Sequence, residues 1–171
     1  LYKIGSSRIK NEDVNHDLYV LKNNNLIATL DIKDSLKPNT KAVLDQMIEK
    51  GYKTTLLSGD KKIKCKTIGK ELGIENIYSE QLPQDKIKKI EKINAKIPTA
   101  MVGDGINDAA ALASATVGIS LANATQIAIQ TADVVLLNDE NLKQLPKVMS
   151  IGKHTLLTIK QNLFWAFAYN A

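Results

Sequence analysis

Two aspartates four residues apart are the strongest candidates for chemistry in this chain. Asp104 and Asp108 lie in the tight segment Gly103-Asp104-Gly105-Ile106-Asn107-Asp108, directly after a short apolar run. Mg²⁺ prefers oxygen ligands and usually takes only one or two carboxylates, with water and phosphate oxygens completing its shell. Glycine permits the sharp turn and the close backbone approach that an anion site needs. The segment therefore predicts a magnesium site beside phosphate chemistry, with Asp104 and Asp108 as the carboxylates that face the metal.

Two further segments carry groups that such chemistry requires. Phosphoryl transfer needs positive charge on the transferring oxygens and neutral donors that orient the group. Ser58 and Gly59 offer a hydroxyl and a backbone N–H after a β-rich run, with Asp60 next in sequence. Lys86, shortly after Pro83, could reach a phosphate as a point charge. Taken alone, Ser58-Gly59-Asp60 is typical of an ordinary turn and helix cap, and Lys86 of a surface lysine.

The elements expected to position these groups alternate between helix and strand. We predict helices over residues 38–51, 61–72, 83–95, 108–113, 124–131 and from about 141, and strands over 53–57, 76–79, 99–102, 116–119 and 133–137. This order predicts an α/β fold with a parallel sheet and helices on both faces. Ligands of such sheets bind at the carboxyl ends of the strands, where both polar segments fall. Residues 18–21 and 26–30, on either side of an asparagine-rich turn, predict a preceding β-hairpin.

Composition narrows the classes of function. The 171 residues suffice for one domain with a proper core. The net charge of +5 is basic, but only 5% of residues are aromatic and no basic run has interleaved aromatics, so we expect no nucleic-acid partner. The single cysteine, Cys65, excludes a disulfide within the chain. The apolar run 163–171 is far shorter than the roughly 20 residues of a membrane span, so it is either an amphipathic final helix or the start of a membrane helix.

The order of these motifs resembles the haloacid-dehalogenase-like superfamily, and particular segments resemble its P-type ATPases. Met101 to Leu112 is similar to their hinge segment. Residues 115–120, 132–137 and 34–38 are similar to the branch that transports heavy metals. The resemblance covers about residue 26 to the end. It implies a haloacid-dehalogenase-like Rossmannoid fold and an ATP-driven cation pump that uses Mg²⁺ and forms an aspartyl phosphate.

The resemblance also implies a role for each candidate residue. Asp104 would hold Mg²⁺, Ser58 and Gly59 would contact the phosphoryl group, and Lys86 would stabilise its charge. Asn107 and Asp108 would orient and support this shell. The resemblance also implies that Gly5, Asp34 and Asp60 lie near the bound nucleotide. Gly5-Ser6 stands where the family usually has Gly-Asn.

The resemblance divides the chain into three parts. Residues 1–30 would be the tail of a nucleotide-binding domain, residues 31–150 a phosphorylation domain, and residues 151–171 a helix leading into a truncated transmembrane segment. The family's phosphorylated aspartate lies in an Asp-Lys-Thr-Gly-Thr segment that this chain lacks. We therefore expect a fragment whose partners are the rest of its own polypeptide and the membrane. It would lie on the cytoplasmic side of the cell membrane and be inactive alone.

The last residues suggest which ion is transported. Copper-transporting members carry a Tyr-Asn pair at the ion site, which Tyr169-Asn170 matches, whereas zinc and cadmium transporters typically have a lysine there. We therefore expect a heavy-metal ion, most simply copper moving outward, as the cargo. An interfacial aromatic anchor is the alternative interpretation of Tyr169.

Two other functions compete with the pump. A small Mg²⁺-dependent phosphatase of the same superfamily could use Asp31, which follows an apolar strand, as its nucleophile. Such enzymes want a second acid two residues later, where this chain has Lys33. A regulatory or nucleotide-binding module that keeps the fold without turnover is the non-enzymatic alternative.

Overall fold

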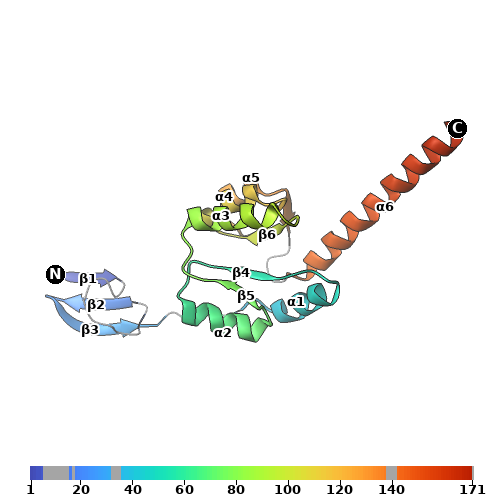
Figure 1. Ribbon diagram of the computed structural model, residues 1–171. Helices are drawn as coiled ribbons and strands as arrows, with labels where there is room; N and C mark the ends of the chain where they lie inside the picture. Colours follow the sequence, from blue (N-terminus) through green and yellow to red (C-terminus); the bar gives the residue numbers. More distant parts are fainter. Residues whose placement is uncertain (6–15, 17, 32–35, 138–141, 171) are drawn as a thin grey trace. The chain divides into compact units, whose positions relative to one another are not determined.

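The chain folds into two compact units, residues 1–36 and 37–171 (Figure 1). The computed structural model describes residues 1–5, 16, 18–31, 36–137 and 142–170. The division by contacts falls between Leu36 and Lys37, while the predicted domain boundary at residues 30 and 31 remains a prediction.

The N-terminal unit is a three-stranded antiparallel sheet. Its strands are β1 (Tyr2–Gly5), β2 (Leu18–Lys22) and β3 (Asn25–Leu30), paired in the order β1-β2-β3. Asn23 and Asn24 form the β2–β3 turn with φ of 51° and 67°. Positive φ at both central positions is the geometry of the tight hairpin turn, and asparagine tolerates it. The predicted hairpin is confirmed, and β1 is an additional strand that was not predicted.

The second unit alternates helix and strand as predicted. Its elements are α1 (Thr40–Glu49), β4 (Thr55–Leu57), α2 (Lys62–Leu72), β5 (Asn76–Tyr78), α3 (Pro83–Asn94), β6 (Ala100–Gly103), the 3₁₀ turn η2 (Ile106–Asp108), α4 (Ala109–Ser114), β7 (Val117–Leu121), α5 (Gln126–Thr131), β8 (Val134–Leu136), the 3₁₀ turn η3 (Leu142–Gln144) and α6 (Leu145–Asn170). Gly73 closes α2 at a φ of 72°, so the predicted helix end is confirmed. Pro38 was expected in the first turn of α1, but the helix begins at Thr40 after a left-handed Asn39.

All strands of this unit pair in parallel, as the alternating pattern predicts. Within the described residues they form two sheets, β4–β5 and β6-β7-β8, with no hydrogen-bonded ladder between the two sets. Figure 1 shows α2 with the first sheet and α3, α4 and α5 gathered around the second. The carboxyl ends of β4 and β6 therefore belong to separate sheets of one compact unit.

The second sheet has helices on both of its faces. Ile119 and Leu121 of β7 pack with Val43 and Met47 of α1 and with Leu145 of α6. Successive strand residues point to opposite faces, so Gly118 lies on the other side. There a Cβ on Gly118 would stand 2.8 Å from the carbonyl oxygen of Leu112 in α4. The glycine therefore lets α4 approach the sheet closely, and the expected helix–sheet–helix layering is confirmed.

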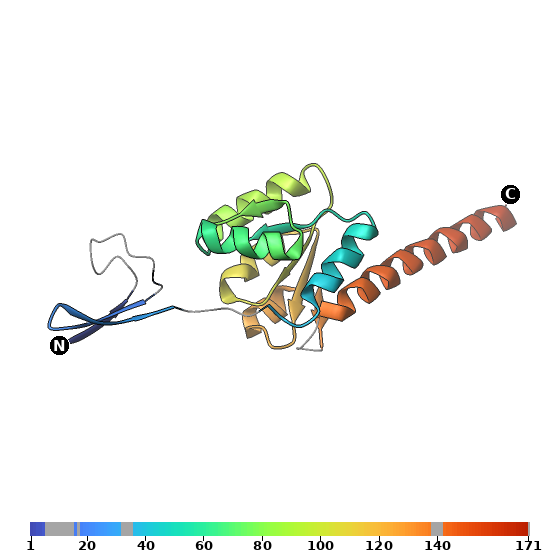
Figure 2. The same cartoon turned by 90° about the horizontal axis from the view of Figure 1, so that it is seen from below.

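Helix α6 is anchored only by its first turns. Leu145 and Pro146 are buried, while residues 150–170 are exposed. Figure 2 shows the start of α6 beside α1 and the remainder of the helix extending away from the other elements of this unit. None of the helices that the structure describes combines the length and the hydropathy needed to span a membrane.

Candidate functional site

The two polar segments that the sequence singles out both follow parallel strands. Ser58 comes directly after β4, and Asp104 directly after β6. The main-chain N–H of Ser58 donates to the Tyr78 carbonyl at the end of β5 (2.9 Å). The main-chain oxygen of Asp104 accepts from the N–H of Thr125, the residue that caps α5 (3.0 Å). Each segment is thus fixed to a neighbouring element through its backbone, which leaves its side chains available for chemistry.

A short ion pair between Lys86 and Asp108 joins distant parts of this region. The Nζ of Lys86 donates to Oδ1 of Asp108 at 2.7 Å, and the two side chains are only 11% and 19% exposed. Pro83 fixes the start of α3, and the carboxylate of Asp85 accepts from the N–H of Leu82 (3.2 Å), so the first turn is well capped. The lysine on α3 is therefore held rigidly against the turn after β6.

Gly103 makes room for the Asp108 side chain, whereas Gly105 leaves ordinary contact space beside it. A Cβ on Gly103 would lie 3.0 Å from Cβ of Asp108, and one on Gly105 would lie 3.5 Å from Oδ2 of Asp108. The main-chain N–H of Asp108 donates to the Gly105 carbonyl (3.1 Å), which closes the turn. The close approach expected of these glycines is therefore found at Gly103, where it is to the chain's own Asp108 side chain.

Asp104 faces a lysine that was not predicted as a site residue. The Nζ of Lys37 lies 3.6 Å from Oδ2 of Asp104, and among the described residues this buried ammonium group has no hydrogen-bond partner. The Asp104 side chain is 56% exposed, so most of its carboxylate is open to other ligands. Lys37 lies within residues 34–38, a segment that resembles the family, but this resemblance gave the lysine no role at the site.

Ser58 and Asp60 bond mainly to each other. Oγ of Ser58 donates to Oδ2 of Asp60 (2.8 Å) and accepts from the Asp60 N–H (3.1 Å). Lys64 pairs with the other carboxylate oxygen at 3.8 Å. These contacts close a local bend before α2, as expected of a turn. The expected helix cap is wrong, because the residue that caps α2 is Lys61 and no side chain bonds to the first N–H groups of the helix. A second role toward a phosphoryl group stays a prediction.

A chain of contacts nevertheless links the two polar segments. The Ser58 carbonyl accepts from the Gln81 N–H (3.0 Å), and a Cβ on Gly59 would stand 3.3 Å from the Gln81 carbonyl. Gln81 lies two residues before α3, the helix that carries Lys86 to Asp108. Among the described residues, no hydrogen bond or ion pair joins Ser58 directly to Lys86 or Asp104. The segments meet through α3, a connection that only the folded chain reveals.

The remaining candidates lie apart from this cluster or outside the described residues. Asn107 is exposed in η2. Gly5 ends β1 opposite Tyr19 in the N-terminal unit. Asp34 falls outside the described residues. The roles predicted for Asn107, Gly5 and Asp34 therefore stay predictions, since no contact of the described residues tests them.

The Tyr169-Asn170 pair ends α6. Tyr169 is 85% exposed and its ring lies 6.1 Å from that of Trp165, while the Asn170 amide donates to the Ala166 carbonyl (2.7 Å). No group of three or more His, Cys, Asp or Glu residues in the described part of the chain is arranged to hold a metal. A site for transported metal at this pair therefore stays a prediction.

Asp31, the alternative nucleophile, lies in the N-terminal unit. Both oxygens of its carboxylate are 2.9 Å from Nδ1 of His16. Lys86, Asp104 and Asp108 belong to the other unit. Asp31 is thus engaged with a histidine in a unit that does not contain the predicted magnesium ligand.

The chain has clear relatives. Residues 6–116 match the family model of the haloacid dehalogenase-like hydrolases. The chain is 35% identical over 154 residues to the copper-exporting P-type ATPase B of Archaeoglobus fulgidus. This match covers 90% of the chain and 22% of that protein. It is 39% identical over 156 residues to a probable copper-importing P-type ATPase A of Enterococcus hirae. This match covers 90% of the chain and 21% of that protein. The chain thus spans about a fifth of the length of these curated relatives.

A solved structure is also similar. A zinc-transporting PIB-type ATPase matches with a TM-score of 0.74 and 32% identity over 85% of this chain and 24% of that one. The predicted resemblance is therefore confirmed, both in sequence and in fold.

We predict that the Lys86–Asp108 pair contributes to stability. Lys86→Met leaves the Asp108 carboxylate poorly solvated, and we expect the free energy of unfolding in urea to fall by about 2–3 kcal/mol. This is less than the ~3–5 kcal/mol for a fully buried pair, because both side chains keep some exposure. Lys88→Met, an exposed lysine on the same helix, is the control and should change stability by less than about 0.5 kcal/mol.

A double variant makes the prediction specific to the pair. Adding Asp108→Asn to Lys86→Met removes the unpaired charge, so the combined loss should be smaller than the sum of the single losses. Equal effects of Lys86→Met and Lys88→Met, or strictly additive single effects, would show that the contact contributes nothing.

Proposed function

The chain belongs to the haloacid dehalogenase-like hydrolase family, and from that membership we propose that it is the C-terminal part of the phosphorylation domain of a heavy-metal P-type ATPase. Its parent would hydrolyse ATP through an aspartyl phosphate and move a metal ion across the membrane. One observation supports this most strongly: a half-exposed Asp104 begins a glycine turn after a parallel strand, and Asp108 at the end of the same turn holds Lys86. The similarity in sequence and in fold to P-type ATPases is the second support.

The residues at this turn fit a magnesium ion. Mg²⁺ keeps several waters and takes only one or two carboxylates from protein, so a single open carboxylate is an appropriate donor set. The Lys37 ammonium group beside Asp104, which has no hydrogen-bond partner among the described residues, supports the fit, because a cation already lies next to this carboxylate. When bound, the metal would neutralise charge on the phosphoryl oxygens. Lys37 would give up its contact with Asp104 in that state.

The other side chains of the turn would receive the phosphoryl group. Lys86 brings a fixed ammonium group, and its anchoring by Asp108 removes the entropy cost of ordering a flexible lysine. Asp108 would thus position Lys86 and support the metal's shell, and Asn107 would help to orient that shell. Ser58 and the Gly59 N–H would donate to the phosphoryl oxygens, which requires the Ser58 hydroxyl to turn away from Asp60.

We place the strand that bears the phosphorylated aspartate between β4 and β6. Within the described residues β4 pairs only with β5 and β6 only with β7, so each keeps one edge without a partner. An added strand would satisfy both rows of backbone groups and would end beside Ser58 and Asp104. The chain has no Asp-Lys-Thr-Gly-Thr segment, so the strand would come from another part of a parent several times longer.

The two ends of the chain would connect to the other parts of the parent. Residues 1–30 would be the tail of the nucleotide-binding domain, with Gly5, Asp34 and Asp60 near ATP. Residues 151–171 would lead α6 into the membrane, with this part of the protein on the cytoplasmic side. The exposed apolar side chains of α6, including Phe164 and Phe167, support such a continuation.

We propose copper as the transported ion and export as the direction. The copper-transporting relatives and the Tyr169-Asn170 pair support copper over zinc. One relative is described as an exporter and another as a probable importer. The proposal of export is supported by the relatives that are described as exporters. The direction of ATP-driven copper flux across the membrane of vesicles that contain the parent tests it separately.

We expect the chain alone to hydrolyse neither ATP nor p-nitrophenyl phosphate, because the phosphorylated aspartate would come from elsewhere in the parent. Malachite-green assays of released phosphate measure this directly, with Asp31→Asn as the paired variant. Robust phosphatase activity that Asp31→Asn abolishes would establish the small-phosphatase alternative and overturn the pump assignment.

In the intact parent we expect Asp104→Asn to lower phosphoenzyme formation from labelled ATP by about 100-fold or more, since a neutral amide is a poor magnesium ligand. Asp45→Asn is the control, because Asp45 is a surface residue of α1 that pairs only with Lys41 in the described part of the chain. Wild-type phosphorylation in the Asp104 variant would remove this residue from the metal site.

A further inference from the structure

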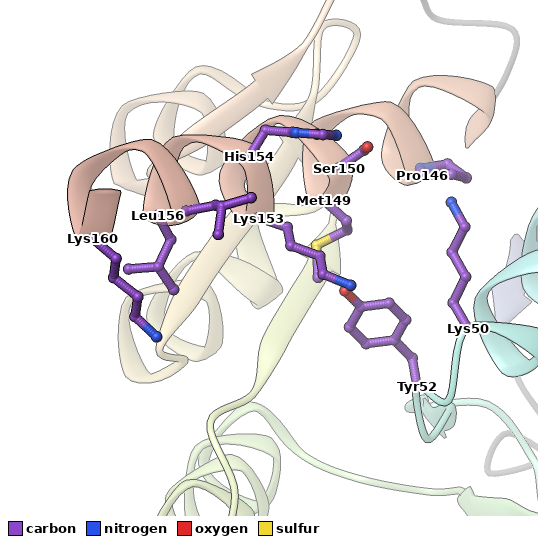
Figure 3. A pocket seen from close by; sticks show the side chains of 10 residues that line it. Lys50, Tyr52, Pro146, Met149, Ser150, Lys153, His154, Leu156 and Lys160 are labelled. Atoms are coloured by element: carbon purple, nitrogen blue, oxygen red, sulfur yellow. The ribbon is translucent and has the colours of Figure 1, made fainter. Parts of the chain in front are cut away.

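The ammonium group of Lys37 has an unusual environment for a lysine. Its nitrogen is shielded from water, has no hydrogen-bond partner within the described part of the chain, and lies 3.6 Å from Oδ2 of Asp104. Lysines without an ion pair elsewhere stand in solvent. Figure 3 shows three of them, Lys50, Lys153 and Lys160, lining the groove between α6 and the segment after α1, and all three are exposed. An ammonium group leaves water without hydrogen bonds only where a negative charge holds it, and here that charge is Asp104.

The backbone of Lys37 is fixed by the start of α1. Pro38 follows it in the chain, and a residue before proline is strongly biased toward extended conformations. Its carbonyl oxygen accepts from both the N–H (3.2 Å) and the Oγ1 (2.7 Å) of Thr40, the first residue of α1. The lysine side chain therefore starts from a fixed point. Only its flexible methylene stem has to move for the ammonium group to leave Asp104.

A cation held in this way competes with a metal ion for the same carboxylate. Asp104 is the open carboxylate of the glycine turn, and Lys37 neutralises part of the charge that would attract Mg²⁺. Because the lysine is tied to the same chain, its ammonium group stays at a high effective concentration beside Asp104. The apparent affinity for the metal is then reduced by the fraction of time for which the carboxylate is free.

We propose that Lys37 is a tethered competitor of Mg²⁺ that keeps metal binding at Asp104 weak enough for release after each turnover. The proposal rests on the proposed function, which makes Asp104 the magnesium ligand. Lys37 would swing into solvent as the metal binds and return as the metal leaves. Asp104 would thus keep a positive partner throughout the cycle, and the strength of that partner would set how much Mg²⁺ the site needs.

Titration of the chain with Mg²⁺, followed by NMR, measures this competition. The Gly105 amide reports metal at the turn, and the methylene group next to the Lys37 ammonium reports its departure from Asp104. We expect both signals to move with one midpoint. If Lys37 occupies Asp104 for roughly 70–90% of the time, Lys37→Met should lower the dissociation constant for Mg²⁺ about three- to tenfold. Lys37→Arg keeps the positive charge and should leave the constant close to that of the unchanged chain.

Lys41→Met is the matched control. Lys41 is an exposed lysine of α1 that pairs with Asp45 at 3.0 Å, so its removal should leave the dissociation constant unchanged. The amide spectrum shows in the same experiment whether each variant is folded, and Lys37→Gln takes the place of Lys37→Met if that variant does not fold. Loss of structure would weaken metal binding, so tighter binding cannot come from a merely structural role of Lys37.

The failures are distinguishable. An unchanged or weaker affinity in Lys37→Met, an equal gain in Lys41→Met, or a Lys37 signal that does not follow the Gly105 amide would overturn the competitor and leave Asp104 as the metal ligand. Asp104→Asn tests the proposed function separately. If this variant binds Mg²⁺ as tightly as the unchanged chain, or if the unchanged chain shows no saturable shift at the turn, the metal site falls and the competitor falls with it.

Discussion

The contact between the Lys86 ammonium and the Asp108 carboxylate holds the functional region together. It joins α3 to the turn after β6 across 22 residues of sequence, at 2.7 Å and largely out of water. Without it the lysine would be one more mobile surface cation. With it, a positive charge has a fixed position at the end of the turn that Asp104 begins, and Gly103 leaves the space that the Asp108 side chain fills. The end of β6, the start of α3 and the glycine turn together fix the positions of the Lys86 ammonium and the Asp108 carboxylate.

The region balances its charges in pairs. Lys86 is matched with Asp108, and Lys37 with Asp104, yet the two pairs differ in kind. The first is a short hydrogen-bonded pair, while the second is a 3.6 Å contact to an ammonium group without a hydrogen bond among the described residues. A buried charge with imperfect compensation costs free energy. The second pair is therefore the one that a divalent cation could disrupt at little cost, and the first is the one that should persist through the cycle.

Local signals in the sequence predicted most of the fold. Gly73 ends α2, Pro83 begins α3, and the apolar runs before Ser58 and Asp104 form strands, because each depends on nearby backbone preferences. The strand β1 was missed because its pairing with β2 joins residues that are far apart in sequence.

The candidate site was predicted in part. Its residue types and spacing located the turn at Asp104 and Asp108, and the resemblance named Lys86. Lys37 could not be predicted as a partner of Asp104, since nothing local indicates that a lysine 67 residues earlier has a buried ammonium group. The link through Gln81 likewise exists only in the folded chain. Long-range approach of polar groups is decided by packing, which a single sequence does not display.

The most direct test of this account is a crystal structure of the chain grown with Mn²⁺, which prefers the same oxygen ligands as Mg²⁺. Anomalous difference density would locate the metal. The account predicts one strong peak bonded to the Asp104 carboxylate at about 2.1–2.2 Å, with Lys37 moved away and the Lys86–Asp108 bond intact. A peak on Asp108 with Lys86 displaced, or an undisturbed Lys37–Asp104 contact at saturating Mn²⁺, would contradict it.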